Sequence, residues 1–237
     1  MSRLGADRIK NVALAGHAGS GKTSLAEAMM FKAGVIDRHG KVAEGNTVCD
    51  FDPEEVKRRA SLSLSVAQFG YNDVKLNLLD TPGLFDFAAG LYEGVSAADS
   101  VLIAVSGKSG VTVGAKKAYK LAKKCGKATM FFVGKMDSEN ADFYKVLESL
   151  KAEFGPSVCP VVVPYSQNGK VECYINLLEM RAYKYDKNGG AVQVEMPDSE
   201  HRLDGLIAAI SEAVAETDEE PVSYTHLTLP TNSRVEI

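Results

Sequence analysis

Residues Asn11–Met30 read NVALAGHAGSGKTSLAEAMM, and three patterns follow one another within them. Val12–Ala15 is a short apolar run of the kind that forms a buried strand. GHAGSGKT, at Gly16–Thr23, fits the pattern G-x-x-x-x-G-K-[ST]. In SLAEAMMFKA, which follows, the apolar residues recur at helical spacing. A strand, a glycine-rich loop and a helix in this order predict a phosphate-binding loop, with a turn that binds nothing as the alternative.

The loop offers both backbone and side-chain contacts to a phosphate. Its glycines let consecutive N–H groups point inward, and the helix N-terminus adds partial positive charge. The Lys22 ammonium would reach the β- and γ-phosphates, and the Thr23 hydroxyl would bind magnesium. His17 would contact phosphate through its backbone rather than act as a catalytic imidazole. The residues expected around the phosphates are Gly16, His17, Ala18, Gly19, Ser20, Gly21, Lys22, Thr23 and Ser24.

A second apolar strand, in VKLNLLDTPG at Val74–Gly83, ends in a carboxylate. Asp80 would hold the water shell of the magnesium ion and so complement Thr23. The Gly83 N–H can approach a γ-phosphate because no side chain blocks it. The pattern D-x-x-G is common at strand ends, but its place one strand after the loop predicts a sensor of the nucleotide state. The residues expected there are Asp80, Thr81, Pro82, Gly83 and Leu84.

A third strand runs through ATMFFVGKMD and ends in a lysine and an aspartate. The Asp137 carboxylate can accept hydrogen bonds from N1–H and N2–H of guanine, while the Lys135 stem lies over the purine. This predicts GTP and GDP as ligands, with a solvent-facing K-x-D as the alternative. The residues expected around the base are Gly134, Lys135, Met136 and Asp137.

Strand and helix patterns alternate between these motifs, which predicts an α/β fold with a mostly parallel sheet flanked by helices. We expect strands near residues 11–15, 61–69, 75–79, 101–105 and 129–133, and helices near 22–33, 88–97, 114–125, 142–154 and 199–215. Residues 1–157 would form the core and 158–221 part of a small α+β insert. VSYTHLTLPT, within 222–237, is similar to translated sequencing-adapter read-through and is interpreted as a non-native tail.

The composition and net charge of the chain limit the classes of partner that it is expected to bind. The chain has 237 residues, 45% of them hydrophobic, and a net charge of −4, so we expect neither DNA nor a membrane as partner. Its apolar runs are too short to cross a bilayer, and its charged N-terminus does not read as a signal peptide, which indicates the cytoplasm. The basic stretch GAKKAYKLAKKCGK has two interpretations: a contact with ribosomal RNA, or a solvated helix face, which its amphipathic pattern favours.

In order and character, GHAGSGKT, DTPGLFDF and GKMD resemble the G domain of elongation factor G and related translational GTPases. The stretch VCPVVVPYSQNGKVECYINLLEMRAYKYD is similar to the subdomain inserted in the G domain of bacterial elongation factor G. The resemblance implies a P-loop GTPase that binds GTP and Mg²⁺ and acts on the ribosome. It also implies catalytic positions at Lys22, Thr23, Gly83 and Leu84.

Three positions depart from the family pattern. Leu84 stands where the family has a histidine that organises the attacking water, which implies slow hydrolysis because leucine cannot hydrogen-bond water. Gly134 stands where the family has an asparagine that braces the base loop. Ser61 aligns with the threonine that closes on magnesium, so the resemblance implies a metal site of Thr23, Ser61 and Asp80.

The leading interpretation is a GTPase of the elongation factor G type that drives or regulates a ribosomal step such as translocation. Two alternatives stay open: a GTP-gated ribosome-binding switch with little hydrolysis, and a ribosome-protection factor of the same superfamily. An adenine-specific ATPase is less favoured because of Asp137.

Overall fold

The computed structural model describes residues 5–167, 170–186, 190–197 and 202–215. The chain divides into two compact units between Asp142 and Phe143. Helix α5 (Phe143–Phe154) therefore belongs to the second unit. From the sequence we had expected this helix in the core, which we placed at residues 1–157. The interpretation of residues 222–237 as a non-native tail concerns residues outside the described part.

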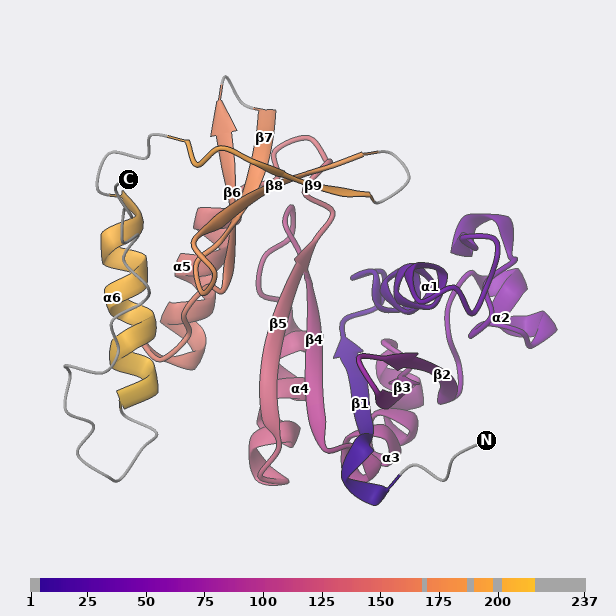
Figure 1. The fold of residues 1–237 in the computed structure, drawn as a ribbon. Helices are drawn as coiled ribbons and strands as arrows, with labels where there is room; N and C mark the ends of the chain where they lie inside the picture. Colours follow the sequence, from indigo (N-terminus) through magenta and orange to yellow (C-terminus); the bar gives the residue numbers. More distant parts are fainter. Residues whose placement is uncertain (1–4, 168–169, 187–189, 198–201, 216–237) are drawn as a thin grey trace. The chain divides into compact units, whose positions relative to one another are not determined.

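A five-stranded sheet forms the centre of the first unit, in the order β2-β3-β1-β4-β5 (Figure 1). β1 is parallel to β3 and β4, and β4 is parallel to β5, whereas β2 and β3 form an antiparallel hairpin. This confirms the predicted mostly parallel α/β fold. The strands are β1 (Ile9–Gly16), β2 (Ser65–Tyr71), β3 (Val74–Asp80), β4 (Ser100–Ser106) and β5 (Ala128–Gly134).

Helices pack on this sheet where the apolar pattern predicts them. One cluster of buried side chains joins α1 to β1, β2, β3 and β4, and it includes Leu14, Ala26, Met30, Phe69, Leu78 and Leu102. The helices are α1 (Lys22–Lys32), α2 (Pro53–Arg58), α3 (Ala88–Ala97) and α4 (Val113–Lys124), and the short 3-10 helices are η1 (Ala6–Arg8), η2 (Val42–Glu44) and η3 (Phe85–Phe87). Since β1, β3 and β5 are oriented alike within the sheet, their carboxyl ends meet at one edge.

The predicted strand over residues 61–69 begins too early, because β2 starts at Ser65. The N–H groups of Leu62 and Ser63 donate to Glu55 Oε1, at 2.8 and 3.1 Å, instead of to a neighbouring strand. Glu55 belongs to α2, a helix that we did not predict although its start carries a clear signal. Asp52 caps it with a capping box, and Pro53 is its first residue.

Arg59 ends α2 in the left-handed conformation, with φ 53° and ψ 41°. We expect Arg59→Gly to raise the free energy of unfolding by about 0.5 to 1 kcal/mol, because the strain relieved exceeds the added chain entropy. Urea denaturation measures the change. Arg59→Ala removes the same charge but keeps a Cβ, so it should bring no gain. An equal gain from both variants would show that strain at this position is not the cause.

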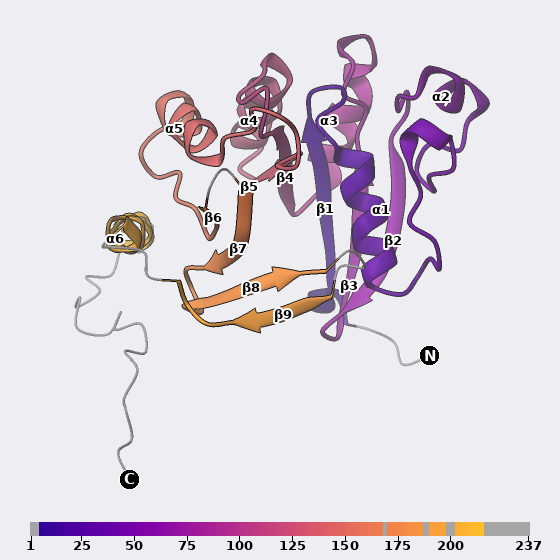
Figure 2. The ribbon, with the colours of Figure 1, turned by 90° about the horizontal axis from the view of Figure 1, so that it is seen from above.

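The second unit holds a four-stranded antiparallel sheet in the order β6-β7-β8-β9, and Figure 2 shows the opposite directions of β8 and β9. The strands of this sheet are β6 (Val162–Gln167), β7 (Lys170–Asn176), β8 (Arg181–Tyr185) and β9 (Ala191–Val194). The unit also contains the helices α5 and α6 (Arg202–Ala215). The predicted turns around NGK and KNGG involve residues 168–169 and 187–189, outside the described part. Its core includes Val163, Cys173, Ile175, Leu177, Ala182 and Leu203. Within the described residues of both units, no helix has the length and apolar character to span a bilayer.

Candidate functional site

The glycine-rich loop joins the end of β1 to the start of α1, and its backbone needs glycine at several positions. Gly16, Gly19 and Gly21 have φ of 139°, 72° and 100°, which L side chains rarely adopt. A Cβ on Gly16 would also come within 2.5 Å of the Ala104 carbonyl oxygen in β4. The chain therefore curls tightly between β1 and α1, and the helix begins at Lys22 with its first N–H groups unbonded within the helix.

The Lys22 side chain lies inside this loop, and only 5% of the residue is exposed. Its Nζ donates to the carbonyl oxygens of Gly16 and His17, at 3.3 and 3.0 Å. Burial lowers the pKa of the ammonium, while the charges of Asp80 and Asp50 act in the opposite direction. A buried cation at the N-terminus of a helix, whose first N–H groups have no partner within the helix, is the arrangement that binds a phosphate anion.

Three residues far apart in the sequence, Thr23, Ser61 and Asp80, meet beside the loop. Thr23 Oγ1 donates to Asp80 Oδ2 at 2.7 Å and lies 3.2 Å from Ser61 Oγ. These are the residues that we predicted as magnesium ligands. Their oxygens form the set of hydroxyl and carboxylate donors that magnesium prefers. Binding of the ion to them stays a prediction.

Asp50 joins this cluster, and sequence reasoning missed it. Its Oδ1 accepts a hydrogen bond from Ser61 Oγ at 2.7 Å, and the residue is 4% exposed. Asp50 Oδ2 and Asp80 Oδ1 are buried without a hydrogen-bond partner in the described part of the chain. Two half-satisfied carboxylates beside two hydroxyls fit a divalent cation. Asp50 lies in an irregular segment, so no strand or glycine pattern marks it.

Burial raises the pKa of both carboxylates, Asp80 and Asp50. It raises the pKa of Asp80 to about 6, although the hydrogen bond from Thr23 and the charge of Lys22 act against the rise. Burial also raises the pKa of Asp50, against the hydrogen bond from Ser61. Like charges nearby add to these shifts: the charge of Asp50 raises the pKa of Asp80 further, and the charges of Glu55 and Glu27 raise the pKa of Asp50 further. A bound cation would relieve this repulsion.

Two further buried carboxylates hold the segment that carries Asp50 and Ser61. Glu27, on α1, has no exposed surface and accepts hydrogen bonds from the N–H groups of Gly40 and Val48. Glu55, 1% exposed, accepts those of Leu62 and Ser63 just after Ser61. The segment is thereby tied at both ends to helices of the first unit.

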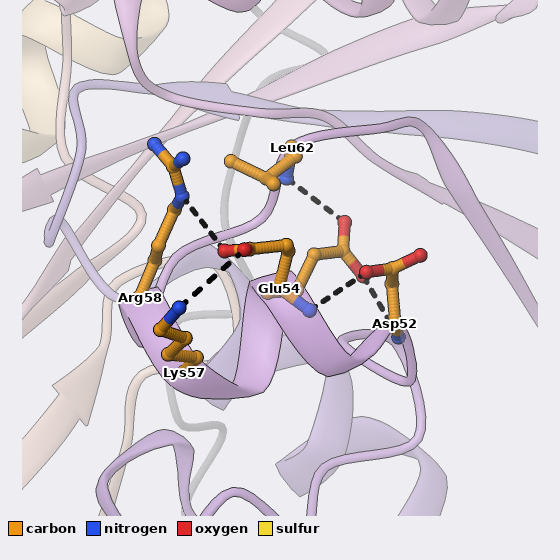
Figure 3. Close-up of polar contacts among 6 residues, drawn as sticks. Asp52, Glu54, Lys57, Arg58 and Leu62 are labelled. Atoms are coloured by element: carbon orange, nitrogen blue, oxygen red, sulfur yellow. Dashed lines mark hydrogen bonds and ion pairs between the residues drawn. The ribbon is translucent and has the colours of Figure 1, made fainter.

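Figure 3 shows the contacts around α2 and suggests a test of Glu55 with a neighbouring residue as control. Glu55→Ala should lower the free energy of unfolding by about 2 to 3 kcal/mol, because the N–H groups of Leu62 and Ser63 lose their acceptor. Glu54 lies on the surface of the same helix, with ion pairs to Lys57 and Arg58 at 3.6 and 3.2 Å. Glu54→Ala should cost less than about 1 kcal/mol. Equal losses in urea denaturation would contradict the role given to Glu55.

The segment Asp80–Leu84 lies directly against the loop. Thr81 donates from its N–H and from Oγ1 to the Leu14 carbonyl oxygen, at 3.2 and 2.7 Å. A Cβ on Gly83 would come 2.5 Å from Lys22 Nζ and 2.6 Å from the Ala18 nitrogen. Any side chain at residue 83 would therefore push this segment away from the loop. The predicted sensor residue thus lies against the phosphate loop, while its contact with a γ-phosphate stays a prediction.

Leu84 is half-buried and precedes η3, whose first residue contacts the loop. The rings of Phe85 and His17 lie 5.6 Å apart, and Lys117 Nζ lies 4.1 Å from the centre of the Phe85 ring. His17 Nδ1 is buried without a hydrogen-bond partner among the described residues. The Leu84 side chain itself has no polar atom, so it cannot orient a water molecule.

The residues predicted to contact the base follow β5. Lys135 has φ 57°, and its Nζ donates to the Gly19 carbonyl oxygen at 2.7 Å, which ties this segment to the phosphate loop. A Cβ on Gly107 would come 2.6 Å from Met136 Sδ, so the turn after β4 packs closely against it. The Asp137 carboxylate is exposed. The structure thus brings the phosphate and base segments together, while contact with guanine stays a prediction.

The sequence and the fold of this chain are similar to those of known proteins. The sequence matches the family described as elongation factor Tu GTP binding domain over residues 7–228. Similar proteins include an elongation factor G-like protein of Mycobacterium tuberculosis, 33% identical over 212 residues that cover 90% of this chain and 29% of that protein. Another of that name, from Thermotoga maritima, is 35% identical over 217 residues, covering 91% of this chain and 30% of its own length.

A crystal structure of a Thermus thermophilus protein has a similar fold, with a TM-score of 0.84 and 38% sequence identity. The similarity covers 90% of this chain and 32% of that protein. The chain spans 29–30% of the length of the curated relatives it matches.

Proposed function

Because this chain belongs to the elongation factor Tu GTP-binding domain family, we propose that it binds GTP and GDP with magnesium and hydrolyses GTP in a translation factor of the elongation factor G type. The observation that carries the proposal is the buried Lys22 ammonium inside the glycine loop, with the hydroxyl and carboxylate oxygens of Thr23, Ser61 and Asp80 beside it. A cation for phosphate and oxygen ligands for a metal are the two groups that a magnesium nucleotide requires.

Each residue has a distinct task in this mechanism. Lys22 and the loop N–H groups would hold the β- and γ-phosphates, and the Gly83 N–H would donate to the γ-phosphate. A magnesium ion held at this site would supply positive charge that offsets the charge of the phosphates. The hydroxyls of Thr23 and Ser61 would hold it, and Asp80 and Asp50 would accept hydrogen bonds from its water. Most of the rate enhancement would come from positioning and charge.

The finer parts of the proposal concern rate and partners. Leu84 supports slow hydrolysis, since the catalytic segment offers no side-chain acceptor for the attacking water at this position. The relatives' printed name, elongation factor G-like protein, supports a role in translation. The proposal places this role on the ribosome in the cytoplasm, in translocation or another step, with ribosomal RNA as a contact. Neither a membrane nor DNA is part of this proposal.

Nucleotide binding by the full chain tests the proposal. A fluorescent GDP analogue should bind in the presence of magnesium, be displaced by GTP and lose affinity when EDTA removes the metal. A large excess of ATP should not displace it. A folded protein that binds no GTP at millimolar concentration, or that prefers ATP, would overturn the proposal.

A second candidate, a GTP-gated ribosome-binding switch with little hydrolysis, is supported by the leucine at residue 84. Single-turnover GTP hydrolysis with and without ribosomes separates the two. Ribosome-stimulated turnover supports the enzyme, whereas nucleotide-dependent binding to ribosomes without turnover supports the switch. A ribosome-protection factor would in addition restore translation that an antibiotic inhibits.

A further inference from the structure

One region of the chain is strongly basic although the whole protein carries a net charge of −4. Residues 100–136 contain eight lysines and no aspartate or glutamate. Most of these lysines lie on α4, whose sequence VGAKKAYKLAKK has no acidic residue to neutralise them. The basic region is thus concentrated on one helix of the first unit.

The lysines of α4 share one face, which we call the lysine face. At about 100° per residue, they fall within about a third of the circumference of the helix. All of them are exposed, and they are Lys116, Lys117, Lys120, Lys123 and Lys124. The opposite face is buried and consists of Gly114, Ala115, Ala118, Leu121 and Ala122.

Several lysines of the lysine face lie one helical turn apart, so their positive charges form a row along α4. Lys120 and Lys124 are one turn apart, so their ammonium groups can contact successive phosphates of an extended backbone. Lys123 is exposed, and its Nζ lies 5.8 Å from the centre of the Tyr119 ring. An ammonium group carries three N–H donors that can bond an anion. At the other end of the face, Lys117 covers Phe85.

We propose that the lysine face binds the phosphate backbone of RNA. This rests on the proposed function, since a ribosome would present such a backbone. A membrane fits less well, because the apolar side of α4 is buried in the first unit and Val113 is the one large apolar residue of this helix that is exposed. An acidic protein also fits less well, because Val113 and the lysines are the exposed residues of α4, and none of them is an aromatic residue of the kind that anchors protein interfaces.

Two triple variants with the same change of net charge test this. One is Lys120→Gln, Lys123→Gln and Lys124→Gln; the control is Lys10→Gln, Lys41→Gln and Lys57→Gln, three exposed lysines outside α4. Lys117 stays unchanged because its contact with Phe85 reaches the nucleotide site. Binding of the full, GDP-loaded chain to fluorescent poly(U) is measured over a series of salt concentrations, together with GDP affinity.

The wild-type affinity for poly(U) should fall steeply with salt. The α4 variant should lose about 0.7 per lysine from the slope of log K against log salt, about 2 in total, whereas the control should keep the wild-type slope. GDP affinity should be the same in all three proteins. RNA binding that depends on α4 in a protein that binds no GDP would support the lysine face and contradict the proposed function.

Three results would overturn the inference. Equal losses in the two variants would mean that net charge alone governs RNA binding. Phosphatidylserine vesicles that bind in the same lysine-dependent way, while poly(U) does not, would identify a membrane surface instead. A folded wild-type protein that binds GDP but shows no salt-dependent RNA binding would also contradict it.

Discussion

Asp137→Asn is expected to lower the affinity for GTP on the order of a hundredfold and to raise the affinity for xanthosine triphosphate. The carboxylate can accept hydrogen bonds from both N1–H and N2–H of guanine. An amide has only one acceptor oxygen, so its NH₂ group would face one of these two donors without forming a hydrogen bond. Xanthine carries an oxygen in place of the 2-amino group, and the amide NH₂ can donate a hydrogen bond to this oxygen. Competition against a fluorescent GDP analogue measures both affinities.

Glu139→Gln is a matched control for Asp137→Asn, because Glu139 is an exposed acid in the same segment. It removes the same charge two residues away and should leave both affinities unchanged. Asp137 is exposed in the structure, so its replacement should not affect the core. Should Asp137→Asn bind GTP as tightly as the wild type, the assignment of the base site would be wrong.

Leu84→His should raise GTP turnover on ribosomes by on the order of ten- to a hundredfold. An imidazole nitrogen can accept a hydrogen bond from the attacking water, and the leucine side chain cannot. The backbone at Leu84 is extended, with φ −79° and ψ 140°, so histidine can adopt it without strain. Single-turnover hydrolysis with bound GTP measures the chemical step apart from nucleotide binding.

Leu84→Met is the matched control, since methionine has a similar volume and no comparable acceptor for water. It should hydrolyse GTP at the wild-type rate. Both variants should bind GDP like the wild type, because neither change alters Lys22 or the loop backbone that we expect to hold the phosphates. A Leu84→His protein that is no faster than the methionine variant would show that orientation of the water does not limit the rate.

Local sequence patterns predicted most of the central sheet and the phosphate loop. The helices at α1, α3 and α4 begin and end within a few residues of the predicted bounds, because their apolar residues repeat at helical spacing. The glycine pattern from Gly16 to Gly21 encodes backbone conformations that few other residues adopt. These features depend on neighbours in the chain, so the sequence alone carries them.

Patterns failed where a group's hydrogen-bond partner is a side chain that no periodic or glycine pattern marks. Ser61–Leu64 looks like the start of a strand, yet the Glu55 carboxylate takes the N–H groups of Leu62 and Ser63. Asp50 carries no periodic or glycine signal, and its place in the oxygen cluster depends on its bond to Ser61. Asp50 and Asp80 are candidates for a cation because each is a buried carboxylate with one oxygen left without a partner among the described residues, and burial is a property that the sequence does not show.

The amino-acid sequence by itself determined the α/β fold and the order of the phosphate, sensor and base segments, because periodicity and glycine conformations act over a few residues. The tertiary structure decided which oxygens face one another: Ser61 links Asp50 to Thr23, and Thr23 in turn bonds Asp80. Glu27 and Glu55 hold the segment that carries Asp50 and Ser61 through backbone N–H groups. Such contacts require the sheet to bring strand ends together, which no short stretch of sequence encodes.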